Sequence, residues 1–479
     1  MQKNINEIKT VLEKHEYSIN TIICDVAKKF KLKTICSQII ECKNSGYKPS
    51  DIIMLMVMMP LMLLNSVHSL YKSQYKNTVA MKKDAIYRLK NNEKMPWRRL
   101  LYAISKQFKN LVSEYTLEKD KKITAFIIDD TSDIRVGEKI ENISFIHDHT
   151  SNKKGSRLGF KHLMLGYFDG VSILPLDFTT HKEKPLSPKK RKMQYKKDAI
   201  KNSNGYKRRK ECKDDKITSA LKMIKRATKN GFSPNYVLAD SWFTSLKFIS
   251  TVRNIKNGSM HIIAGIKNDK RHYVYQDMNM NGKELIVKLQ KEGKQKRCRQ
   301  WNTRYFEVTV EYPGVGEVKL YICRFPYQKK WRLFISTDVN LTFTKMMETY
   351  SVRWTIEIMF KELKQHLHLG KCKSQDFDAQ IADITISLIL FVFLSYYKRV
   401  SDYESLGTLF IAIKDDICEK NLAQRIWEMF DELLSVVINL ISKNGMVDLC
   451  QFQQSLEYVY LKELFESSFL NNQLLSIDK

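Results

Sequence analysis

The sequence lacks paired cysteines and a secretion signal. Its 9 cysteines are scattered, with no Cys-x-x-Cys pair and no His-x3-His nearby, so neither a zinc site nor disulfides are indicated. The first residues, MQKNINEIKT, do not follow the basic-then-apolar order of a signal peptide. We therefore expect a protein of the reducing cytoplasm.

Only two apolar runs need to be considered as membrane spans, because a span needs roughly 20 residues. The first candidate, Ile52–Leu64, is shorter and contains Pro60. The second, Ile384–Tyr397, includes three hydroxyl side chains and is flanked by Asp383 and Lys398. We expect both runs to be buried core helices, with no membrane partner.

Acidic residues are in short supply. The chain has 81 Lys and Arg against 52 Asp and Glu, a formal net charge of +29. With 43% hydrophobic and 28% charged residues, it is expected to fold, and its length suggests about two to four domains. Such a surplus in a folded chain indicates a polyanionic partner, of which nucleic acid is the commonest and an acidic membrane face the alternative.

Helical patterning dominates residues 1–118. Near their end, the basic segment Met81–Lys90 precedes Trp97-Arg98-Arg99. Basic helices with aromatic side chains can lie on DNA, and a solvated helix face is the alternative. We therefore predict a helical, DNA-binding N-terminal region at 1–118.

Two apolar segments that follow are each directly succeeded by acidic side chains. The β-branched run 123–128 stops at Asp129-Asp130, and the run 235–239 stops at Asp240. Both are predicted to be buried strands. Between them, the segments 162–167 and 172–178 flank an Asp-Gly turn and predict a hairpin.

The remaining segments complete a predicted α/β organisation. Residues 189–216 hold 13 Lys and Arg against 4 Asp and Glu, an excess that could line a DNA channel or form a basic loop. Residues 268–340 alternate as in β-strands, and helical patterning resumes afterwards. We therefore predict a core at 119–267, a β-rich insertion at 268–340, the second part of the core at 341–400 and a helical region at 401–479.

One helical segment, 350–364, carries a polar face. At 100° per residue, Tyr350, Arg353, Glu357 and Lys364 share a sector of about 60° beside an apolar stripe. Taken alone, Arg353 and Glu357 could be a simple i,i+4 ion pair, worth a few tenths of a kcal/mol.

Together with the strand-end acids, this segment predicts a catalytic site. Three carboxylates with cations nearby suit phosphodiester chemistry that uses two divalent ions roughly 3.5 to 4 Å apart. Hard oxygen ligands favour Mg²⁺, with Mn²⁺ as a substitute. We predict Asp130, Asp240 and Glu357 as the catalytic metal ligands.

The spacing Tyr-x2-Arg-x3-Glu-x6-Lys at 350–364, preceded by a strand with Asp-Thr and a strand ending in Asp, resembles the DDE transposases of bacterial insertion sequences, specifically the IS-four family. The resemblance spans about residues 80–400. It selects Asp130 over Asp129, because the family's catalytic Asp is typically followed by Thr.

This resemblance implies a ribonuclease-H-like mixed-sheet core interrupted by the β-rich insertion. It also implies cut-and-paste transposition through a hairpin intermediate, with Tyr350, Arg353 and Lys364 contacting DNA phosphates. The expected partners are double-stranded DNA, as terminal inverted repeats and target, and a second copy of the chain in a synaptic complex. The C-terminal region would mediate that dimer, and the expected location is the bacterial cytoplasm, at the nucleoid.

Two alternatives remain open at this point. A structure-specific, metal-dependent nuclease of the same fold would carry the same three acids but would not join DNA ends. A DNA-binding repressor derived from a transposase would bind without cleaving. The motif partners Tyr350, Arg353 and Lys364 favour transposition.

Overall fold

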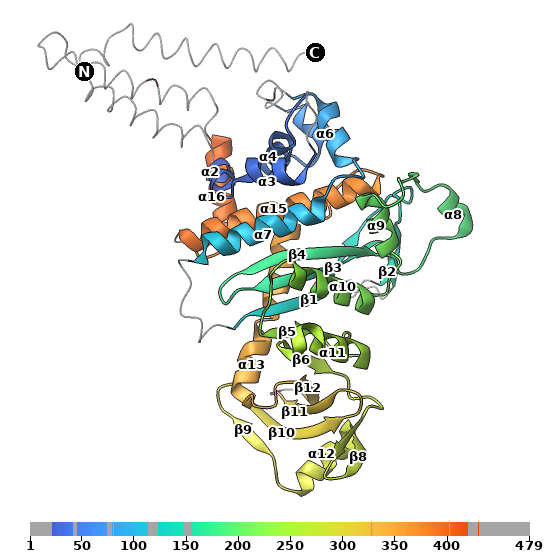
Figure 1. Ribbon diagram of the computed structural model, residues 1–479, viewed down its shortest axis with the longest axis vertical. Coiled ribbons are helices and arrows are strands. Elements are labelled where there is room, and N and C mark those ends of the chain that lie inside the picture. Colours follow the sequence, from blue (N-terminus) through green and yellow to red (C-terminus); the bar gives the residue numbers. More distant parts are fainter. Residues whose placement is uncertain are drawn as a thin grey trace, which may run out of the picture. The chain divides into compact units, whose positions relative to one another are not determined.

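The computed structural model describes most of the chain, in two compact units (Figure 1). The described residues are 22–41, 46–73, 79, 81–113, 123–147, 155–326, 328–401, 403–419 and 430. The larger unit comprises residues 90–365 and 369–392, and the smaller one comprises residues up to 89, residues 366–368 and residues from 393. Each unit is described by itself.

In the described part of the larger unit, twelve strands form one mixed sheet. The order along the sheet is β2-β3-β1-β5-β6-β12-β11-β10-β7-β8, with β4 paired to β3 and β9 to β10. The strands are β1 (Ala125–Ile134), β2 (Ser144–His147), β3 (Ser156–Phe168), β4 (Ile173–His181), β5 (Tyr236–Ala239), β6 (His261–Ile266), β7 (His272–Tyr275), β8 (Met278–Asn281), β9 (Lys296–Cys298), β10 (Thr303–Tyr312), β11 (Gly316–Arg324) and β12 (Arg332–Ser336).

The centre of this sheet is the part that matters for function. Strands β1, β5 and β6 run parallel to one another, whereas β3 and β4 form the predicted antiparallel hairpin. Their central residues are almost completely buried, as the continuous apolar runs required. The hairpin prediction and the strand before Asp240 are confirmed.

The prediction that β1 stops at its carboxylates is wrong. Strand β1 continues to Ile134, and its whole length pairs with β3, from Ala125 opposite Phe168 to Ile134 opposite Gly159. Its other neighbour, β5, pairs only as far as Ala239. The acids therefore lie where the parallel neighbour ends, and β1 persists because β3 still supplies a ladder of hydrogen bonds.

Helices α7, α9 and α10 of this unit pack beside the hairpin strands, mainly β4 (Figure 1). Their amphipathic patterning buries apolar residues such as Leu100 of α7 and Ile224 of α10. Arg98, part of the basic segment expected to meet DNA, instead forms ion pairs with Asp177 and Glu211. The helices are α7 (Trp97–Leu111), α8 (Pro188–Lys192), α9 (Asn204–Glu211), α10 (Lys216–Lys229) and α11 (Leu246–Arg253), followed by a short 3-10 turn, η4 (Ile255–Gly258).

Residues 268–340 are rich in strands, as predicted, and also contain a helix that the alternating pattern did not suggest. Helix α12 (Gly282–Lys291) begins with a capping box in which Asn281 and Glu284 satisfy each other's backbone N–H groups. Strand β12 pairs with β6, so this segment extends the same sheet.

The segment predicted as one helix over 350–364 is broken. Helix α13 (Phe343–Ser351) and helix α14 (Trp354–Gln365) are separated at Val352 and Arg353. The backbone N–H of Arg353 bonds to the carbonyl of Tyr350 at 3.0 Å, three residues back, which tightens the chain into a turn. Tyr350 and Glu357 therefore lie on different helices.

Helix α15 (Phe377–Val400) is long and apolar enough to cross a membrane by length and composition, but 94% of its apolar window is buried inside the protein. The prediction of a buried core helix is confirmed. The first apolar run, Ile52–Leu64, is helical only as far as Met58, in α4 (Pro49–Met58), which buries Ile53 and Val57. The rest of the run contains Pro60 and lies outside the helix.

The smaller unit is helical in its described part. Helices α2, α3 and α4 contact one another, and Phe30 packs its ring against Phe393 and Tyr396. The predicted C-terminal region, 401–479, is described only for α16 and its surroundings, so the proposed dimerisation segment lies outside the described residues. The helices are α2 (Ile22–Lys29), α3 (Leu32–Ile39), α5 (Val67–Leu70), α6 (Lys83–Lys90) and α16 (Leu406–Glu419).

Candidate active site

Two acidic residues meet at the centre of the sheet. In the parallel pair β1–β5, Ile128 lies opposite Ala239, so the next residues along the two segments are Asp129 and Asp240. Residues opposite each other on neighbouring strands share a face of the sheet, and successive residues alternate between faces. This register places Asp129 next to Asp240, while alternation turns the side chain of Asp130 the other way. Asp130 nevertheless lies close enough to Asp240 to raise the pKa of its carboxyl.

Asp129 faces the turn before α14. Its Oδ2 lies 3.0 Å from Nη1 of Arg353, and its Oδ1 accepts the backbone N–H of Asp130 at 2.8 Å. Burial, with smaller contributions from the charges of Asp240 and Asp130, raises the pKa of the Asp129 carboxyl to about 7, although Arg353 acts in the opposite direction. Asp129 therefore carries a proton far more readily than an exposed aspartate.

Arg353 links this strand to the helix that carries Glu357. Its Nη2 lies 2.6 Å from Oε1 of Glu357, while Nη1 contacts Asp129. Burial disfavours the charged guanidinium, but Tyr350, Glu357 and Asp129 outweigh that effect, so the pKa of Arg353 is raised. One guanidinium thus holds a carboxylate from β1 and a carboxylate from α14.

The carboxyl of Asp240 lies within electrostatic reach of Arg353, Asp130 and Lys216. Burial raises the pKa of its carboxyl and Asp130 adds to that increase, whereas Arg353 and Lys216 lower it. Its Oδ1 also accepts the backbone N–H of Trp242 at 2.8 Å, which fixes the side chain at the end of β5. Asp240 therefore lies within electrostatic reach of Asp129, Asp130 and Arg353.

Asp130 has a different set of contacts. Its Oδ2 lies 2.7 Å from Nζ of Lys216, the first residue of α10, and its Oδ1 lies 3.7 Å from Nζ of Lys161 on β3. The same two lysines lie 3.6 Å from Glu183. Asp130 is held in an ion-pair cluster with these lysines, and Asp129 is the β1 acid that contacts Arg353.

The remaining motif residues lie around this centre. The ring of Tyr350 packs edge-on against Phe334, and the guanidinium of Arg353 lies 5.9 Å from the Tyr350 ring. The Tyr350 hydroxyl lies beside Gly265 of β6, where an added Cβ would be in ordinary van der Waals contact with it at 3.6 Å. Lys364 is exposed on α14, about two turns beyond Glu357.

The donor chemistry of Asp129, Asp240 and Glu357 fits a divalent cation, because all three offer hard oxygen ligands. The raised pKa values of Asp129 and Asp240 indicate negative charge that a cation would offset. Among the described residues, no three His, Cys, Asp or Glu side chains stand close enough together to hold a metal ion. Arg353 is the cation that spans Asp129 and Glu357 in this structure.

Sequence reasoning gave no role to Trp242 or Lys216. Trp242, two residues after Asp240, is 64% exposed, and Nζ of Lys267 and Nζ of Lys216 lie 4.8 Å and 5.9 Å from its ring. Lys216 belongs to the basic stretch 189–216, and the excess of cations in that stretch is the sequence signal that could have pointed to it. An exposed tryptophan with two ammonium groups over its ring is a platform on which a nucleic-acid base can stack.

A mixed sheet that carries neighbouring acids on β1 and directly after β5, with a helical glutamate and surrounding cations, is suited to phosphodiester chemistry. Residues 172–393 match the family model described as "Transposase DDE domain". The match supports a DDE transposase, and with it a ribonuclease-H-like fold, DNA binding and metal-dependent DNA cleavage. No curated protein matches the chain.

The matched segment covers just under half of the chain and includes Asp240 and all four motif residues from Tyr350 to Lys364. It begins after β1, so it does not distinguish Asp129 from Asp130. That distinction depends on the contacts of the two side chains.

Proposed function

We propose that the protein is the cut-and-paste transposase of an insertion sequence of the IS-four family. The observation that carries the proposal is the contact of Arg353 with both Asp129 and Glu357, next to Asp240. This arrangement joins an acid within β1 and the acid after β5 to the helix motif, although the three acids are far apart in the chain. In the proposed reaction, water cleaves the element end, the freed 3′-hydroxyl forms a hairpin with the opposite strand, and the reopened end joins target DNA.

Asp129, Asp240 and Glu357 are the proposed ligands of two Mg²⁺ ions, with Mn²⁺ as a substitute. Bound there, such ions lower the pKa of the attacking hydroxyl and stabilise the leaving oxygen. Asp130, favoured by the sequence motif, stays a prediction. Its pairing with Lys216 and Lys161 supports a positioning role, because these ion pairs hold the opposite face of β1 against α10 and β3.

The cationic and aromatic motif residues are proposed to hold the DNA backbone. The Arg353 guanidinium lies beside the carboxylates, where its planar fork can bind two oxygens of the reacting phosphate. The ring of Tyr350 lies beside the guanidinium of Arg353 and limits the movement of that side chain on one side. Lys364, exposed on the same helix as Glu357, contributes a second charge to the transferred strand.

The wider organisation of the protein is part of the same proposal. Residues 268–340 are a β-rich insertion between the last core strand and the Glu357 helix, and residues 1–118 supply further DNA contacts. Two copies of the chain assemble on paired element ends in a synaptic complex. As a transposase, the protein is expected in the cytoplasm, at the nucleoid.

The decisive experiment uses a donor DNA bounded by the inverted repeats that flank the gene. With Mn²⁺, the wild-type protein is expected to give nicked, hairpin and joined products. Asp129→Asn is expected to abolish all three while DNA binding persists, whereas Asp130→Asn retains measurable cleavage. If Asp130→Asn alone is inactive and Asp129→Asn is active, Asp130 is the metal ligand and the geometric argument for Asp129 fails.

The same assay separates the alternatives. Cleavage without hairpin or joined products would identify a nuclease of the same fold. DNA binding without any cleavage by the wild-type protein would identify a repressor. Either result would overturn the proposal of transposition.

A further inference from the structure

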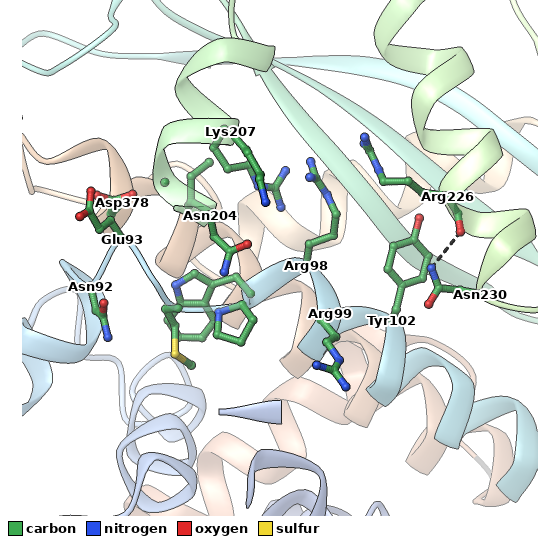
Figure 2. A pocket seen from close by; sticks show the side chains of 16 residues that line it. Asn92, Glu93, Arg98, Arg99, Tyr102, Asn204, Lys207, Arg226, Asn230 and Asp378 are labelled. Carbon is green, nitrogen blue, oxygen red and sulfur yellow. Dashed lines mark hydrogen bonds between the residues drawn. The ribbon is translucent and has the colours of Figure 1, made fainter. Parts of the chain in front are cut away.

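A pocket of about 390 Å³ lies in the larger unit, apart from the carboxylates described above. Its lining comes from the segment that enters α7, from α7 itself, from the start of α9, from the end of α10 and from the start of α15 (Figure 2). None of Asp129, Asp240, Arg353 and Glu357 lines it. A cavity of this volume is within the range of small-ligand sites.

The lining is strongly basic. It carries five cationic side chains and two acidic ones. The cations are Arg98, Arg99, Lys207, Arg208 and Arg226, and the acids are Glu93 and Asp378.

The two acidic groups of the lining are already occupied by partners from outside it. Asp378 forms ion pairs with Arg209 at 2.9 Å and Lys197 at 2.9 Å, and Glu93 accepts the backbone N–H of Ile200 at 3.0 Å. Arg99 and Lys207 are exposed, and the described residues offer neither of these side chains an ion-pair partner. The pocket therefore has a surplus of positive charge.

Three buried N–H groups of the lining have no hydrogen-bond partner within the described part of the chain. They are Nε1 of Trp97, Nη2 of Arg208 and Nη2 of Arg226. Trp97 is 3% exposed and the Arg208 side chain 6% exposed. A buried donor left without an acceptor is costly and uncommon. These donors indicate that an acceptor-rich group belongs in the pocket.

The arginines beside these donors are incompletely neutralised by the protein. Asp177, fully buried on β4, is shared by Arg98 at 2.8 Å, Arg226 at 2.7 Å and Arg208 at 3.9 Å. Glu211 is the second acid of this cluster and contacts Arg98 and Arg226. Burial, together with the neighbouring charge of Arg98, lowers the pKa of Arg208 to about 9. An added anion would restore the balance of three guanidiniums against two carboxylates.

The start of α7 adds to the positive electrostatic potential of the pocket. Its N-cap residue, Pro96, makes no side-chain capping hydrogen bond, and Pro96 and the first-turn residues Trp97, Arg98 and Arg99 all line the pocket. The N-terminal end of a 15-residue helix carries partial positive charge and favours an anion.

We propose that this pocket binds a phosphate-type oxyanion, supplied either by a free nucleotide or by the backbone of bound DNA. Phosphate offers several acceptor oxygens to the unpartnered N–H groups, and its charge matches the surplus of the lining. The site is separate from the proposed catalytic centre and holds its ligand without chemical change.

The test measures binding to the full-length protein by calorimetry, at constant ionic strength and with EDTA to remove divalent cations. Inorganic phosphate and deoxythymidine monophosphate are the probes. The double variant Arg99→Gln, Lys207→Gln removes two charges that the described structure does not use in ion pairs, and it is expected to bind both probes at least about tenfold more weakly. Trp97→Phe, which keeps a ring but removes the N–H, is expected to weaken binding several-fold.

The matched control is Lys106→Gln, Lys210→Gln, on the same two helices but outside the lining. It should bind both probes as the wild type does. Equal weakening in the two double variants, or no binding of either probe to the wild type, would overturn the proposal.

The source of the phosphate follows from competition. If duplex DNA displaces the monophosphate in the wild type, the pocket receives a backbone phosphate. If DNA and monophosphate bind together, the ligand is a free nucleotide. Asp129→Asn should leave phosphate binding unchanged. The proposal of a phosphate pocket and the proposal of the catalytic site can therefore fail independently of each other.

Discussion

The raised pKa of Asp129 predicts that metal binding weakens sharply in mild acid. Its carboxyl has a pKa of about 7 in the folded protein, against about 3.9 in an unfolded chain. Between these two pKa values, the Asp129 carboxyl keeps its proton in the folded protein but has lost it in the unfolded chain. Its contribution to the stability of the folded protein is therefore complete below about pH 4 and is lost as the pH rises through about 7. A bound cation must displace that proton.

The magnitude follows from the same pKa. The ionised fraction of a group with a pKa of about 7 is roughly nine-tenths at pH 8 and one-tenth at pH 6. Mn²⁺ affinity, measured by calorimetry without DNA, is therefore expected to fall about tenfold between pH 8 and pH 6. Asp129→Asn should bind Mn²⁺ weakly at both pH values, because the ligand and its proton are both removed.

Asp130→Asn is the matched control, since it neutralises the adjacent carboxylate on the other face of β1. It should retain the fall in Mn²⁺ affinity with falling pH. A Mn²⁺ affinity that is constant from pH 8 to pH 6 in the wild type, or a dependence that disappears in Asp130→Asn but persists in Asp129→Asn, would refute the assignment of Asp129 as the proton-binding ligand.

Three further predictions concern the surrounding charges. Arg353→Lys should lower the cleavage rate by at least tenfold while DNA binding changes little, because an ammonium group cannot reproduce the two-pronged contact; single-turnover cleavage assays check this. Asp177→Ala should destabilise the larger unit by about 3–5 kcal/mol, since it leaves three arginines without their shared buried partner, whereas exposed Asp198→Ala should have little effect in thermal unfolding. Lys189→Gln with Lys192→Gln on α8 should reduce the slope of log affinity for DNA against log salt by about 2 if both contact phosphates, and an unchanged slope would place α8 away from the DNA.

Local patterns were enough to predict the centre of the fold. The apolar runs before Asp129 and Asp240 are β1 and β5, because continuous β-branched runs fit strands that are buried on both faces. The Asp-Gly turn correctly placed the β3–β4 hairpin. The break at Val352 was not predicted, because the helical periodicity of 350–364 is regular and the turn involves a backbone bond from Arg353 to Tyr350.

The choice between two adjacent aspartates could not be made from alternation alone. Alternation sends Asp129 and Asp130 to opposite faces, but it does not say which face receives α14. That depends on how α14 packs against β1, which brings Arg353 to Asp129 and leaves Asp130 to Lys216. The phosphate pocket was equally hidden, because its lining converges from segments around residues 97, 207 and 226.

The side-by-side arrangement of β1 and β5 has a mechanical consequence. Asp129 lies within β1, and Asp240 is the residue directly after β5, whose pairing with β1 ends at Ala239. The paired strands, about 4.8 Å apart, anchor the backbone that carries both carboxylates. Glu357 comes from a helix that follows a tight turn, and its side chain is held there by a guanidinium. We therefore expect any structural adjustment on substrate binding to occur in α14 and the turn before it, while the sheet keeps its conformation.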